Sequence, residues 1–206
     1  MPKRAGPNAG AETREAVLAA ARRLFTARGY DATSMRDVAA EVGITNSALY
    51  YHFPGKEALL EALSAVRRGE LDALLAWASE QNRSPALLRE TALRWVDAAT
   101  QERLEGMRLG LANRPALARA VPPGADVPGG VENLVGLFAD PGDRVRQLEV
   151  RLIFDAFTCA GLAASPDDDL ATIKAVARRM VLALTAAIDA PPLDDAAEST
   201  YRSNGK

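Results

Sequence analysis

The segment from Ile44 to Phe53, which reads ITNSALYYHF, concentrates side chains that could contact a polyanion. It contains the only histidine of the sequence, two adjacent tyrosines and three small polar residues. Core packing would explain the rings, but a solvated helix surface usually carries lysine and glutamate, and this segment contains neither. Small polar side chains hydrogen-bond to base edges, and tyrosine hydroxyls reach phosphates. We therefore interpret this segment as a surface that contacts nucleic acid.

The flanking residues predict two short helices joined by a tight turn. Ser34 followed by Asp37 is typical of a helix N-cap with a reciprocal acidic partner, and Gly43 allows the positive φ at which such a helix ends. Thr45 is a second N-cap, and Pro54 limits the helix that follows it. A helix, a glycine turn and a second short helix form a helix-turn-helix, whose second helix fits the major groove of DNA.

The rest of the chain shows apolar residues at helical spacing and no convincing alternation of a strand. Pro and Gly suggest a break at 113–115 and a loop over 121–130. Helices are expected over about 12–28, 34–42, 45–53, 56–83, 85–96, 101–111, 134–138, 143–164 and 167–190. The sequence thus predicts an all-α fold, with an N-terminal three-helix bundle and a larger C-terminal helical bundle.

Composition sets the general class of protein. The chain has 206 residues, 48% of them hydrophobic and 25% charged, and a net charge of -2. Residues 1–68 contain ten basic and seven acidic residues, so they carry +3 and the remainder carries -5. This asymmetry fits an N-terminal unit that binds a polyanion, although a solvated helical surface could produce it too. One cysteine, no apolar run after the basic N-terminus and no membrane-length apolar segment predict a cytoplasmic protein.

Catalysis is not expected from this sequence. A single histidine and the distant Cys159 do not suggest a catalytic pair, and the acidic run 167–169 reads as a helix start without the partners of a metal site. We expect no catalytic residue, no metal and no cofactor. The alternative to a DNA-binding protein is a helical ligand-binding or adaptor module without sequence-specific DNA binding, which salt-dependent DNA binding would exclude.

The segment 24–60 resembles the DNA-binding unit of the TetR family of bacterial one-component transcriptional regulators. The resemblance rests on Phe25, Gly29, Tyr30, Thr33, Ser34, Val38, Ala39, Gly43, Ile44, Leu49, Tyr50, His52, Phe53, Lys56 and Leu59. It implies a regulator, most often a repressor, that binds a palindromic operator in double-stranded DNA. The residues that the resemblance places at DNA are Ser34, Arg36, Thr45, Asn46, Ser47, Tyr50, Tyr51, His52 and Lys56. A basic arm with Lys3 and Arg4 would follow the minor groove.

The resemblance covers about the first third of the chain and implies four regions: a flexible arm at 1–10, a DNA-binding domain at 11–55, a ligand-binding and dimerisation domain at 56–190 and a disordered tail at 191–206. The last two long helices would form a homodimer. A small apolar or amphipathic effector, whose identity the sequence leaves open, would bind between helices of the body. The residues expected to line its pocket are Thr91, Trp95, Met107, Leu111, Leu134, Phe138, Phe154, Phe157 and Thr158.

Overall fold

The computed structural model describes residues 9–122, 124, 127–165 and 167–188, and within these residues the chain is helical and has no strand. The all-α fold predicted from the sequence is confirmed. Lys3 and Arg4 of the predicted arm and the predicted tail at 191–206 lie outside the described residues. The helices are α1 (Ala9–Arg28), α2 (Met35–Val42), α3 (Asn46–His52), α4 (Lys56–Ser79), α5 (Pro85–Asp97), α6 (Gln101–Ala112), α7 (Arg114–Ala120), α8 (Val127–Phe138), α9 (Arg144–Ala163) and α10 (Leu170–Ile188).

Two breaks predicted from the sequence are present but shorter than expected. The break expected over 113–115 is confined to Asn113, because α7 starts at Arg114, and α8 begins at Val127, inside the loop expected over 121–130. In both cases the misleading proline lies in the first turn of a helix, where its missing N–H is not needed. Gly130 belongs to α8 and packs closely on α4. A Cβ at this position would lie only 2.7 Å from Leu71 Cδ1, so the close approach requires glycine.

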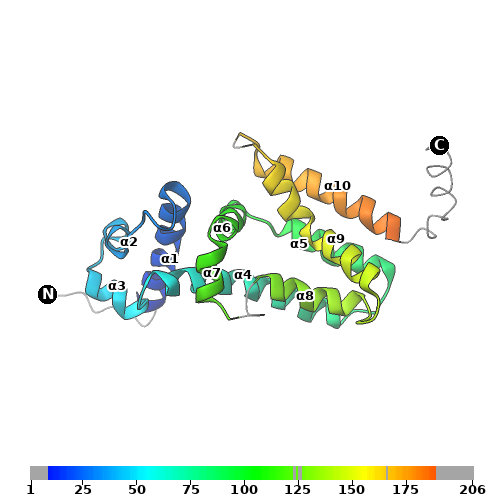
Figure 1. Ribbon diagram of the computed structural model, residues 1–206, viewed down its shortest axis with the longest axis horizontal. Helices are drawn as coiled ribbons and strands as arrows, with labels where there is room; N and C mark the ends of the chain where they lie inside the picture. Colours follow the sequence, from blue (N-terminus) through cyan, green and yellow to red (C-terminus); the bar gives the residue numbers. More distant parts are fainter. Residues whose placement is uncertain (1–8, 123, 125–126, 166, 189–206) are drawn as a thin grey trace, which may run out of the picture.

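The molecule is elongated, and its N-terminal bundle lies at one end (Figure 1). This bundle consists of α1, α2, α3 and the first turns of α4, and its core includes Phe25, Leu49 and Leu59. The remaining helices and the rest of α4 form the body, in which α9 packs against α10 and α4 packs against α8. The body has its own core, which includes Leu71 of α4 and Phe154 of α9.

Helices α4 and α6 connect these two parts. Leu59 and Leu60 of α4 are buried in the N-terminal core, whereas Leu71 of the same helix is buried in the body. Leu109 of α6 also joins the N-terminal core, and Leu104 of α6 joins the body. A displacement of either helix would therefore change the packing in both cores.

Candidate nucleic-acid interface and cavity

The N-terminus of α2 is fixed by a capping box. The Ser34 hydroxyl accepts a hydrogen bond from the Asp37 N–H at 3.2 Å, and Asp37 Oδ2 accepts from the Ser34 N–H at 2.8 Å and from the Ser34 hydroxyl at 2.6 Å. These bonds from Ser34 hold the pKa of the Asp37 carboxyl below its ordinary value. The exposed hydroxyl of Ser34 is thus engaged within the helix start, and Arg36 is exposed two residues further on.

The turn between α2 and α3 sets the orientation of the second helix. Gly43 has φ 76°, in the left-handed region, and the Ile44 N–H donates to the Ala39 carbonyl at 3.0 Å. Thr45 then caps α3 by accepting from the Ala48 N–H at 3.2 Å. Leu49 is fully buried against the bundle, so the rest of α3 faces outward.

The outward face of α3 is polar and aromatic. Thr45, Asn46 and Ser47 are exposed, Tyr50 is 51% exposed and Tyr51 is 86% exposed. A role for Tyr50 as a packed core ring, which the sequence left open, is therefore wrong. His52 is half-buried and its ring lies edge-on to that of Tyr51, with 5.4 Å between the ring centres. Since no acidic residue lies between 44 and 53, this face offers hydrogen-bonding groups without repelling an anion.

Two acidic residues of α2 lie near this face but have partners. The Asp37 carboxylate is held by the capping box, and Glu41 forms an ion pair with Arg23 of α1 at 3.1 Å. Lys56, which the sequence places at DNA, also has partners within the protein: its ammonium donates to the Tyr30 carbonyl at 2.6 Å and lies 4.3 Å from the centre of the Tyr30 ring. In this structure Lys56 holds the start of α4 against the connection between α1 and α2.

A cavity of about 840 Å³ lies between the N-terminal bundle and the body, with walls from α1, α4, α5, α6, α7, α8 and α9. Five residues expected from the sequence line it: Trp95, Met107, Leu111, Phe154 and Thr158. The other four do not border it. Thr91 is fully buried, with its hydroxyl bonded to the Leu87 carbonyl at 2.7 Å, Leu134 and Phe157 are buried in the core, and Phe138 packs against Phe154. Apolar spacing marks inward positions but does not separate packed side chains from those that border a cavity.

Charged residues also line the cavity, and our sequence analysis missed them. Arg103 is only 3% exposed, and its Nη1 donates to the Trp95 carbonyl at 2.8 Å. Its guanidinium lies 3.1 Å from the centre of the Trp95 ring. Burial, together with the nearby charge of Arg67, lowers the pKa of Arg103 to about 9. A signal existed, because Arg103 shares one face of α6 with Met107 and Gly110 at i, i+4 and i+7.

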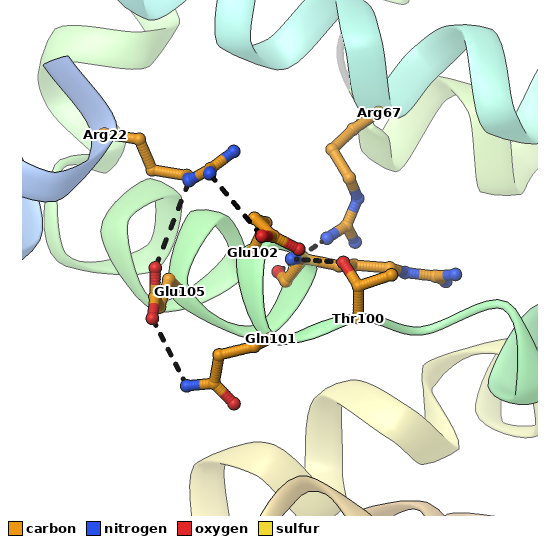
Figure 2. A network of polar contacts seen from close by, with 7 residues as sticks. Arg22, Arg67, Thr100, Gln101, Glu102 and Glu105 are labelled. Atoms are coloured by element: carbon orange, nitrogen blue, oxygen red, sulfur yellow. Dashed lines mark hydrogen bonds and ion pairs between the residues drawn. The ribbon is translucent and has the colours of Figure 1, made fainter. Parts of the chain in front are cut away.

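Arg67 approaches from α4 and reaches the first turn of α6 (Figure 2). Its Nη1 donates to the carbonyl of Arg103 at 2.8 Å, and burial lowers the pKa of Arg67 as well. On the other side of this turn, Arg22 of α1 lies 4.0 Å from carboxylate oxygens of both Glu102 and Glu105 (Figure 2). The start of α6 is thus linked by side chains to α4 and to α1.

Comparison with known proteins confirms the resemblance of the N-terminal segment. Residues 17–63 match the family model described as bacterial regulatory proteins, tetR family. The chain is 32% identical over 106 residues to the HTH-type transcriptional regulator LmrA of Bacillus subtilis strain 168, a match that covers 48% of this chain and 55% of LmrA. It is 38% identical over 53 residues to the HTH-type transcriptional repressor BepR of Brucella suis biovar 1, covering 26% of this chain and 25% of BepR.

The chain therefore spans about half of the length of these two curated relatives, or less. The whole fold is similar to that of SmeT in its complex with triclosan, with a TM-score of 0.61 and 20% identity over 85% of this chain and 91% of SmeT. At that identity the likeness concerns the fold. Among the described residues, no group of metal-binding side chains and no helix with the length and hydropathy of a membrane span is found.

Proposed function

We propose that this protein is a ligand-responsive DNA-binding transcriptional regulator of the cytoplasm. It acts as a repressor that binds a palindromic operator as a dimer and releases it when a small apolar or amphipathic molecule occupies the cavity. The observation that carries the proposal is the outward face of α3. Asn46, Ser47 and Tyr50 are exposed there with no acidic residue among them, while Leu49 on the opposite face is buried in the bundle.

Base recognition falls to the first turn of α3 in this proposal. The Asn46 amide both donates and accepts, which suits adenine in the major groove, and Ser47 donates to or accepts from a base edge. The hydroxyl of Tyr50 and the partly exposed ring of His52 hold the sugar-phosphate backbone and fix the register. Ser34 and Arg36 at the start of α2 extend the backbone contact on the same side of the helix-turn-helix.

Dimerisation through α9 and α10 is the second part of the proposal. These two helices carry large apolar side chains that the body leaves between 43% and 58% exposed, namely Leu148, Leu152, Leu162, Val176 and Leu182. Burying apolar surface is the main driving force of association, so a second copy of the chain is a suitable cover for them. A two-fold dimer would then place its recognition helices about one DNA turn, roughly 34 Å, apart or slightly more.

The cavity gives a physical route from effector to DNA. It touches α1 of the N-terminal bundle as well as α4 and α6, which contribute to both cores. A molecule that binds better to one arrangement of these helices shifts the population toward it, and DNA binding must change by the same factor. DNA recognition thus belongs to residues 11–55 and effector binding and dimerisation to 56–190, with α4 shared between them. No resident cofactor takes part.

The first test is to incubate the protein with fragmented DNA of its host at near-physiological salt and to sequence what is retained. Enrichment of a palindromic site supports the regulator. Failure to enrich any sequence, with and without cell extract, would contradict it and favour a binding module without sequence-specific DNA contact.

Variants of α3 then test the assignment of roles. On the enriched site, Tyr50→Phe should weaken binding to a similar extent for all sequences, because it removes a phosphate contact. Asn46→Ala should instead change the preferred base at one position of each half-site, at a cost of about 1 to 3 kcal/mol for the preferred base. If Asn46→Ala leaves both affinity and preference unchanged, the base-reading role of α3 is wrong.

A further inference from the structure

Several buried polar atoms around the cavity make no hydrogen bond. Within the described residues, six buried side-chain nitrogen or oxygen atoms lack a hydrogen bond, and five of them belong to residues that line this cavity. They are Arg22 Nε, Ser64 Oγ, Arg67 Nε, Arg103 Nε and Arg103 Nη2. Buried polar groups in native proteins are nearly always bonded, so a cluster of exceptions at one place calls for a bonding partner that enters from outside.

Arg103 and Arg67 are the centre of this cluster. Each guanidinium makes one strong hydrogen bond to a backbone carbonyl, from Arg103 to Trp95 and from Arg67 to Arg103. These bonds and the face of the Trp95 ring hold the two groups in place, but they leave three buried N–H positions unused. A buried cation is costly without a counter-charge, and here the half-buried Arg67 lies close enough to the buried Arg103 to lower its pKa further.

The acidic residues around the cavity do not supply that counter-charge. Glu102 lies at ion-pair distance from Arg22, and Asp155 pairs with Arg151 at 3.5 Å. Glu70 acts on both arginines through space, but it is exposed, as is Glu15, the remaining acidic residue of the lining. Within the described residues no ion pair joins either carboxylate to Arg67 or Arg103. The side chains that border the cavity thus leave the buried charge of Arg103 and the half-buried charge of Arg67 open to a ligand.

We propose that the effector is an amphipathic organic acid whose anionic head group is bound by Arg103 and Arg67. A carboxylate or sulfonate accepts two parallel N–H bonds from a guanidinium, which matches the free Nε and Nη2 of Arg103. The apolar body of the molecule lies along Met107 and Phe154, and the volume of about 840 Å³ accommodates one or two rings or a chain of comparable size. This inference rests on the proposed function and specifies the chemical class of its effector.

The position of the two arginines also places the head group at the joint between the two parts of the molecule. Arg67 is on α4 and Arg103 is in the first turn of α6, next to Glu102, which faces Arg22 of α1. An anion between the two guanidinium groups draws α4 and α6 together at that point. The same contact therefore identifies the ligand and alters the helices that carry the N-terminal bundle.

A matched pair of fluorescent probes tests the assignment. Anilinonaphthalene sulfonate is an amphipathic anion, and phenylnaphthylamine has the same ring system without the sulfonate. Binding of each is followed by probe emission excited through energy transfer from tryptophan, of which Trp95 lines the cavity and Trp77 does not. The wild-type protein should bind the sulfonate about tenfold more tightly or better, since a hydrogen bond to a charged group contributes about that much.

Three variants locate the charge. Arg103→Met and Arg67→Met should each weaken the sulfonate about tenfold and leave the neutral probe within about threefold. Arg114→Met is the control, because Arg114 lines the same cavity but is exposed, so the same loss of charge should leave both affinities unchanged. Neither buried substitution should lower the melting temperature, since methionine fills the space and removes an uncompensated buried charge.

Equal affinity of the two probes for the wild type, or equal loss of the sulfonate in Arg114→Met and Arg103→Met, would overturn the inference. Retention of host DNA is measured on the same preparations. A protein that enriches a palindrome but shows no preference for the anion refutes the acidic effector alone. A protein that prefers the anion through Arg103 but enriches no DNA refutes the regulator and keeps the anion site.

Discussion

The turn between α2 and α3 permits a quantitative test through Gly43→Ala. Gly43 has φ 76°, and a Cβ there would meet nothing within 4 Å, so the cost of alanine comes from the backbone conformation and not from a clash. The left-handed region costs a residue with a Cβ about 1 to 2 kcal/mol. Alanine also restricts the unfolded chain, which returns about 0.4 to 1 kcal/mol. The free energy of unfolding should fall by about 1 kcal/mol, or about 2 to 4 °C in melting temperature for a chain of this size.

The same substitution at Gly136 is the matched control. Gly136 is exposed on α8, and a Cβ there would also meet nothing within 4 Å, but its φ is not positive. Alanine is favoured over glycine in a helix by up to about 1 kcal/mol, so Gly136→Ala should be more stable than the wild type. The free energy of unfolding should therefore shift in opposite directions from the wild type, so that the two variants differ by about 2 kcal/mol.

Urea unfolding followed by far-ultraviolet circular dichroism measures both changes, with protein concentration held constant because the proposed dimer would add to stability. Gly43→Asn should recover part of the loss, since asparagine tolerates the left-handed region better than alanine. DNA affinity should fall in Gly43→Ala and stay unchanged in Gly136→Ala, because only the first disturbs the aim of α3. If Gly43→Ala is as stable as the wild type, or if Gly43→Asn is no better than Gly43→Ala, the backbone argument is refuted.

Three further variants test the other contacts. Leu152→Glu on α9 should yield a monomer in size-exclusion chromatography with light scattering, and it should reduce operator affinity about 100-fold or more because bivalent binding is lost. Val66 on α4 is similarly exposed, so Val66→Glu should remain dimeric, and a dimeric Leu152→Glu would contradict the interface. Arg22→Gln removes the partly exposed ion pairs between α1 and α6, so the free energy of unfolding should change by less than about 1 kcal/mol. The ratio of the operator affinity without a bound anion to that with one should become smaller, and an unchanged ratio would exclude coupling through these ion pairs. The hydrogen bonds from Ser34 lower the pKa of Asp37, so the stability they provide is present above the ordinary pKa of 3.8 and is lost as pH falls through the lower pKa of the folded state. Ser34→Ala should therefore lower the urea midpoint at neutral pH and make it decline less in acid. If the urea midpoints of the variant and the wild type decline in parallel, the bonds from Ser34 do not stabilise the Asp37 carboxylate.

The residues that build the helix-turn-helix could be identified from the sequence because their interactions are local. Ser34 and Asp37 cap one helix three residues apart, Gly43 takes the left-handed conformation that its position in the turn requires, and Thr45 caps the next helix. Each of these signals involves neighbours within one turn, so residue type and spacing carry the information. The exposed face of α3 follows from the same local pattern once Leu49 is directed inward.

The cavity and its charges were decided only by the tertiary structure. Whether Trp95 borders a cavity while Phe157 fills the core depends on how helices distant in sequence approach each other, and both residues have the same apolar spacing. Lys56 looks like a surface residue in its own helix, but it is bonded to the Tyr30 carbonyl. The spacing of Arg103 places it on one face of α6 with Met107, but only the tertiary structure shows that it is buried against Trp95. Burial and charge pairing are set by contacts between separate elements, and a single sequence does not record which of these elements meet.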